Sequence, residues 1–396
     1  MASSGAFAKA VFPLLAAASY YCTWGLSERN GHFKSVEQVG SAIPNVLPRT
    51  DAALKRSYVG IEPIDDLLTT LTILFWPALD GSSPQLSLFS FHFAGQVVPL
   101  CVVLMVESRR LGNKWRIVSF ITLWILVFQV AGFTNVIPFY ALIHLFTSPT
   151  ASLRATSPNT PSTNLLVSLP DLVALPISVT LGHIAPAILM SLPSPTFFSF
   201  NTRQTLLSLW QVFPVTISLL QFVLSSLISV VLPYEPQYHS TAERNARTLR
   251  FLRRVYIFGF TISSITHIAT WTISLSSIVV PMIFDAGLVD NFSPARVFLP
   301  PLPNSTAPAT DLGEGLLFFL HYDEYLGFLS LGIWATALYR GADAKGLTLG
   351  GWVRLLAKIV GITVVAGPAT AALALIWARD ELILGEVGEV DGKKML

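Results

Sequence analysis

The sequence predicts an all-α protein, a polytopic bundle of about nine or ten transmembrane helices. Hydrophobic residues make up 52% of the chain and charged residues only 12%, with a mean hydropathy of +0.60. Soluble domains carry roughly 25% charged residues. Apolar runs of the ~20 residues that a helix needs to cross a bilayer also recur along the chain. We therefore expect residues 1–396 to form a single integral membrane domain.

The candidate spans are defined by these apolar runs. The first, with Lys9 at its flank, lacks a convincing cleavage site and is predicted to be a retained helix rather than a signal peptide. The stretch from Trp115 to Phe146 is almost uninterrupted and predicts either one long kinked helix or a tight hairpin. In chain order the runs lie near 6–24, 63–79, 89–107, 115–133, 136–152, 165–191, 204–232, 255–284, 315–339 and 352–377.

The distribution of Lys and Arg predicts the orientation. Basic residues cluster in 28–62, 108–116, 243–254 and 340–354, and the positive-inside rule assigns all four segments to the cytoplasm. An even number of crossings must then separate 108–116 from 243–254. This favours ten spans with both termini in the lumen, with a re-entrant segment at 136–152 as the alternative.

The segment 285–314 is predicted to be a lumenal loop. Its charged residues are four acids and one base, Arg296. It also contains glycosylation sequons at Asn291 and Asn304. These features predict a glycoprotein, and the endoplasmic reticulum is the expected membrane.

Several function classes have no support in the sequence. A net charge of +2 leaves no basic surface for nucleic acid. Cys22 and Cys101 lie in apolar runs, so neither a disulfide framework nor a cysteine metal site is expected. Asp65-Asp66-Leu67-Leu68-Thr69 is one acid short of the motif that holds magnesium on a prenyl diphosphate. No metal and no cofactor are predicted, and protein partners are unknown.

Ionisable groups inside spans are costly, about 2.5–3.5 kcal/mol for a central Asp, so each is a candidate site. His321 and Glu324 share a helix face, whereas Asp323 is turned by about 100°. These acids are either hydrated near the interface or include a desolvated, protonated carboxyl group that acts as a general acid. The predicted topology places several polar residues at this depth: Asp80, His92, Gln96, His183, His321, Asp323 and Glu324.

The other polar residues have structural alternatives. Asp80 fits a turn or helix cap as well as a second acid. His92 and Gln96, four residues apart, are typical of hydrogen bonding between helices. Glu107 is explained by an ion pair with Arg110 at the interface. The isolated His183 and His267 are expected to be structural histidines.

Three motifs are similar to those of one known family. They are Phe75-Trp76-Pro77-Ala78-Leu79-Asp80-Gly81, Phe93-Ala94-Gly95-Gln96 and Glu107-Ser108-Arg109-Arg110-Leu111-Gly112-Asn113. Together they resemble the fungal integral-membrane terpene cyclases of the ascofuranone, ascochlorin and macrophorin meroterpenoid pathways. The resemblance implies an enzyme that cyclises a linear farnesyl chain, often epoxidised and attached to an aromatic polyketide, by protonation. It assigns no catalytic residue.

The residues themselves are compatible with this chemistry, because a membrane site meets a lipophilic prenylated substrate directly and aromatic faces stabilise carbocations. We expect Asp323 or Glu324 to donate the proton, with Asp80 as a hydrogen-bonded partner or alternative donor. Substrate contacts are predicted for His92, Gln96, Glu107, His321, Tyr322 and Tyr325. The alternatives are a transporter or efflux protein for a lipophilic metabolite, in which these groups form a proton relay, and a non-catalytic scaffold.

Overall fold

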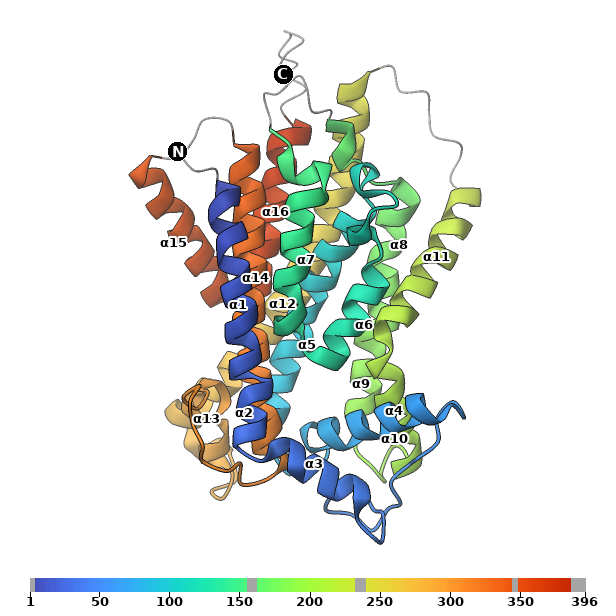
Figure 1. Cartoon of the computed structure of the whole chain (residues 1–396), viewed down its shortest axis with the longest axis vertical. Coiled ribbons are helices and arrows are strands. Elements are labelled where there is room, and N and C mark those ends of the chain that lie inside the picture. Colours follow the sequence, from blue (N-terminus) through green and yellow to red (C-terminus); the bar gives the residue numbers. More distant parts are fainter. Residues whose placement is uncertain (1–3, 155–161, 232–239, 344–347, 386–396) are drawn as a thin grey trace.

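A computed structural model describes residues 4–154, 162–231, 240–343 and 348–385. The described elements are helices, and the only β-pairing among them is an isolated bridge between Val46 and Ala53. Figure 1 shows an elongated bundle. Its upper end contains the end of α5 and the start of α12, and its lower end contains α3, α4 and α13.

Several helices run most of the length of the bundle (Figure 1). α8 continues through a π-helical turn at Thr180–Ile184 into α9. The long helices are α1 (Ser4–Cys22), α5 (Pro84–Ser108), α8 (Leu169–Val179) with α9 (Ala185–Ser191), α11 (Phe213–Val231), α12 (Thr241–Val279) and α14 (Leu312–Ala342).

Five helical segments are long and apolar enough to cross a membrane. Two of them, Phe213–Val231 and Leu349–Ala366, lie at the outside of the bundle and bury little of their surface. Large apolar side chains such as Phe222 and Val364 are 67% and 69% exposed on them. An apolar outer surface of this kind is what a helix bundle presents to lipid.

Two helical hairpins have their turns inside the bundle. α6 (Ile121–Ala131) and α7 (Phe133–Thr147) meet at Gly132, and α15 (Leu349–Ala366) and α16 (Pro368–Gly385) meet at Gly367. Both glycines have positive φ, +90° and +93°, a conformation that other residues adopt only with strain. α6 has 11 residues, about 16 Å, which is too short to cross ~30 Å of hydrocarbon.

These hairpins and α4 correct the predicted spans. The run 115–146 is a hairpin rather than one kinked helix, and the single span predicted at 352–377 is wrong because Gly367 and Pro368 reverse the chain. The span predicted at 63–79 is wrong as well: α4 (Glu62–Phe75) lies across the lower end of the bundle (Figure 1). The count of nine or ten spans is therefore not confirmed. α3 (His32–Ser41) and α10 (Phe200–Gln211) lie at the same end.

Two loops that were expected on opposite faces of the membrane, residues 28–62 and 285–314, contact each other. Arg49 forms an ion pair with Asp311 at 3.2 Å, and Arg29 donates a hydrogen bond to the Pro303 carbonyl. Because α4 does not cross, 28–62 stays at the lower end, whereas the other three basic clusters lie at the upper end (Figure 1).

Asp65 anchors the start of α4. Its carboxylate accepts hydrogen bonds from the backbone N–H groups of Val59, Tyr58 and Gly60 and from the Ser57 hydroxyl. These donors, that of Val59 foremost, lower the pKa of Asp65. The first acid of the Asp65-Asp66 pair therefore has a structural role in the fold.

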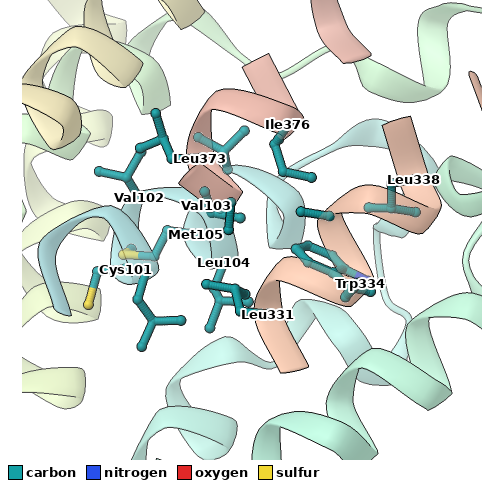
Figure 2. Close-up of a cluster of buried hydrophobic side chains, with 14 of the residues drawn as sticks. Cys101, Val102, Val103, Leu104, Met105, Leu331, Trp334, Leu338, Leu373 and Ile376 are labelled. Atoms are coloured by element: carbon teal, nitrogen blue, oxygen red, sulfur yellow. The ribbon is translucent and has the colours of Figure 1, made fainter. Parts of the chain in front are cut away.

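An apolar core fills the centre of the bundle where α5, α14 and α16 meet. Figure 2 shows the side chains of this core, and each of those labelled is at most 3% exposed. The core separates two polar regions on α5, one at His92 and one at Glu107, which lie about 22 Å apart along the helix. The labelled side chains are Cys101, Val102, Val103, Leu104, Met105, Leu331, Trp334, Leu338, Leu373 and Ile376.

Candidate active site

A buried chain of polar groups links α14, α5, α12 and α15. The Oε1 and Oε2 atoms of Glu324 lie 3.1 and 3.3 Å from Nδ1 of His92. Nε2 of His92 lies 2.9 Å from Nδ1 of His267, whose Nε2 lies 2.9 Å from the Val364 carbonyl oxygen. Glu324 is 1% exposed, His92 3% and His267 5%. The segment 321–324 thus faces the protein interior.

Aromatic rings surround this chain. The ring of Phe298 lies 5.8 Å from that of His92 at an angle of 87°, and stacks on Trp271 at 4.2 Å. Phe89 contacts His92 and lies edge-on to His321 at 4.5 Å. Rings in these positions keep water away from Glu324 and offer π faces to a cation.

Asp323 has a different role from its neighbour. Its Oδ1 atom accepts a hydrogen bond from the backbone N–H of Thr134 at 2.9 Å. Thr134 lies in the first turn of α7, and the N-cap residue Gly132 supplies no side-chain hydrogen bond. Asp323 therefore caps α7 from another helix, where a carboxylate is favoured by the unpaired N–H groups and the helix dipole. The two adjacent acids are directed to different partners.

Gln96 caps the other hairpin. Its Oε1 atom accepts from the backbone N–H of Ala369 in the first turn of α16, at 3.1 Å, and its Nε2 donates to Ser263 Oγ at 2.7 Å. His92 and Gln96 share a face of α5, as predicted, and meet His267 and Ser263, also four residues apart, on α12. This pair therefore joins helices, and His92 in addition contacts Glu324.

The side chains of His321, Tyr322 and Tyr325 hold the end of α13 (Pro294–Phe298) and the residues that follow it against α14. His321 Nε2 donates to the Val297 carbonyl at 2.7 Å, Tyr325 to that of Phe298 at 2.6 Å, and Tyr322 to that of Pro301. These bonds place the Phe298 ring beside His92. Direct substrate contacts by these three residues stay a prediction.

Asp80 lies away from this cluster. Its Oδ1 accepts from the Ser82 backbone N–H at 2.8 Å, which is the turn expected as the structural alternative. Asp80 also lines an open groove of about 420 Å³ with Arg49, Asp311 and Leu312. Glu324 follows Leu312 by twelve residues of α14, about 18 Å. Among the residues that the structure describes, no hydrogen bond joins Asp80 to Asp323 or Glu324.

Glu107 belongs to a second buried polar cluster. Its carboxylate pairs with Arg110 at 2.7 Å and Arg379 at 2.9 Å, and lies 3.1 Å from His144. Arg110 also binds Asp380 at 2.8 Å. The predicted pair with Arg110 is thus confirmed, but it is fully buried in a network of two Arg and two acids. Because the core of Figure 2 lies between this network and Glu324, the two polar regions are distinct.

Among the polar groups linked to Glu324, His267 is the one whose place the sequence did not reveal. It was predicted to be an isolated structural histidine. The available signal was a stripe of polar residues on α12, spaced three or four apart, which is the pattern of one buried helix face. Its buried members are Ser263, His267, Thr270, Ser274 and Ser277.

Comparison with known proteins identifies the family. The CtvD domain model matches residues 8–384, and the chain belongs to this family. It is 32% identical to terpene cyclase ascI of Acremonium egyptiacum over 92% of the chain and 91% of that protein. It is 27% identical to terpene cyclase penA of Penicillium crustosum, over 92% of the chain and 93% of the relative.

Terpene cyclase ctvD of Aspergillus terreus is 27% identical, over 80% of the chain and 84% of the relative. The resemblance to fungal meroterpenoid terpene cyclases is therefore confirmed. No solved structure matches the chain.

Proposed function

We propose that the chain is a multi-pass membrane terpene cyclase in which Glu324 protonates a linear prenyl chain. The observation that carries this proposal is the buried contact between Glu324 and His92, enclosed by aromatic rings. The family relatives named as terpene cyclases support the cyclase activity. In this reading Asp323 positions α7 and is not the donor.

The proposed reaction is an isomerisation, so the product contains the same atoms as the substrate. Glu324 gives its proton to the terminal epoxide oxygen or olefinic carbon of the substrate, and the cation formed at the chain end is attacked by the next double bond. Ring carbon–carbon bonds form from the π electrons, and the final cation loses one proton. Glu324 is reprotonated, so no proton is gained or lost in a turnover.

The proposed substrate is a farnesyl chain, epoxidised or not, attached to an aromatic group. Such a chain partitions into the bilayer and can reach a site between helices from the membrane. The proton generates the first cation, so the reaction needs no diphosphate to leave and no metal. Rings such as Phe298, Trp271 and Phe89 would stabilise the later cations by cation–π contacts.

The proposed topology places the upper end of the bundle in the cytoplasm. The basic segments 108–116, 243–254 and 340–354 lie there, as the positive-inside rule requires. The loops 28–62 and 285–314 would then both be lumenal, with the sequons of Asn291 and Asn304. In this proposal 28–62 is lumenal rather than cytoplasmic as its basic residues predicted, and the endoplasmic reticulum stays the expected membrane.

A cyclisation assay tests the function. Microsomes from a host that expresses the chain are given a farnesyl phenol and its terminal epoxide, with microsomes from the empty host as the control. We expect a new product of unchanged mass and altered retention, formed only with the expressed chain. Unmodified substrate that merely accumulates inside the vesicles would overturn the proposal and indicate transport.

A further inference from the structure

The hydrogen bonds of the polar chain have a fixed direction at one end. The carbonyl oxygen of Val364 carries no proton, so it can only accept. Nε2 of His267, which lies 2.9 Å away, must therefore carry a hydrogen and donate it. This backbone oxygen belongs to α15, three residues before the Gly367 turn that Gln96 holds in place.

The donor at Nε2 of His267 also sets which nitrogens donate and accept in the hydrogen bonds of both histidines. A neutral imidazole has one N–H group and one acceptor nitrogen. Nδ1 of His267 is therefore an acceptor, and Nε2 of His92 donates to it across 2.9 Å. Nδ1 of His92 is left as an acceptor that faces Glu324 at 3.1 Å. When His92 is neutral, a proton on the Glu324 carboxyl completes the hydrogen bond between them.

We infer that His267 is the positioning residue of the proton donor, because it holds His92 in the tautomer that keeps Glu324 protonated. The inference rests on the proposed function for its catalytic consequence, but the proton itself is a property of the resting protein. Without the acceptor at position 267, His92 is free to carry its hydrogen on Nδ1 and donate it to an ionised Glu324. A carboxylate in that state has no proton to give.

Two substitutions separate this role from simple packing. His267→Leu removes the acceptor, whereas the Oδ1 atom of Asn in His267→Asn can accept from His92 Nε2. The matched control is His183→Leu. His183 is also buried; its Nε2 donates a hydrogen bond to the Ala94 carbonyl, and its ring packs against Phe213 and Trp210, away from Glu324.

The first readout is the infrared carbonyl stretch of a protonated carboxylic acid, assigned to Glu324 by its disappearance in Glu324→Gln. We expect the band in the wild-type protein and in His183→Leu, its loss in His267→Leu and partial recovery in His267→Asn. A wild-type protein without the band, or His267→Leu that keeps it, would overturn the inference. Because the band needs no substrate, this result is independent of whether the protein cyclises anything.

The second readout is kinetic. We expect His267→Leu to lower kcat by roughly 10²–10⁴-fold, the usual contribution of a general acid, with KM nearly unchanged, and His267→Asn to recover part of kcat. Equal kcat values for the Leu variant and the wild type would contradict the inference even if cyclisation is confirmed. If the Leu variant does not fold, the Asn variant is the test: a carboxylic acid band and a kcat that are reduced but retained support the role, whereas a folded Asn variant without the band overturns it.

Discussion

Glu324→Gln is expected to abolish nearly all cyclisation. The amide has the size of the acid and can still hydrogen-bond to His92, but it has no acidic proton for the substrate. Loss of a general acid lowers kcat by roughly 10²–10⁴-fold. The measurement is product formation from the epoxyfarnesyl phenol in microsomes that contain equal amounts of folded protein.

The adjacent acid provides the matched control. Asp323→Asn keeps an oxygen that can accept from Thr134 N–H, so the cap on α7 and most of the activity should remain. Asp80→Asn should also retain activity, because Asp80 lies in a separate groove. Full activity of Glu324→Gln, or a loss in Asp323→Asn as large as that in Glu324→Gln, would contradict the assignment of the donor.

Glu107→Gln is expected to destabilise the protein strongly while leaving the chemistry intact. The substitution removes the shared negative charge between Arg110 and Arg379, which are fully buried. Breaking a buried ion pair in this way costs about 3–5 kcal/mol. Thermal and denaturant unfolding of the purified protein in detergent measures the change.

An exposed ion pair of α16, the helix that carries Arg379, serves as the control. Glu381 binds Arg253 at 2.6 Å, and their side chains are 35% and 49% exposed. Glu381→Gln should cost less than about 1 kcal/mol, since solvent screens this pair. If Glu107→Gln left stability unchanged and raised KM, Glu107 would be a substrate residue, as the sequence alone suggested.

The helical bundle could be predicted from the sequence because it follows from hydropathy. The hairpins could not, since an apolar run of given length fits one crossing or two shorter helices. The signals that decide between them are local: Gly132 and Gly367, each with positive φ, permit the reversals. α4 misled the prediction because a helix lying across the end of a bundle can be as apolar as one that crosses it.

The sequence predicted part of the proposed site. The segment 321–324 and the face shared by His92 and Gln96 were identified because ionisable groups are rare in spans. The different partners of the two adjacent acids depend on the tertiary structure: Asp323 faces the α7 terminus and Glu324 faces His92. The role of Glu107 also depends on the tertiary structure, because its partner Arg379 is far along the chain.

The position of the reacting end of the substrate tests the central claim most directly. A structure of Glu324→Gln bound to unreacted epoxyfarnesyl phenol would show it. We predict the epoxide within roughly 3–3.5 Å of the side chain at position 324, the separation of groups poised to react, with the aromatic rings of Phe298 and Phe89 along the chain. An epoxide bound in the groove beside Asp80, or in the network around Glu107, would contradict the account.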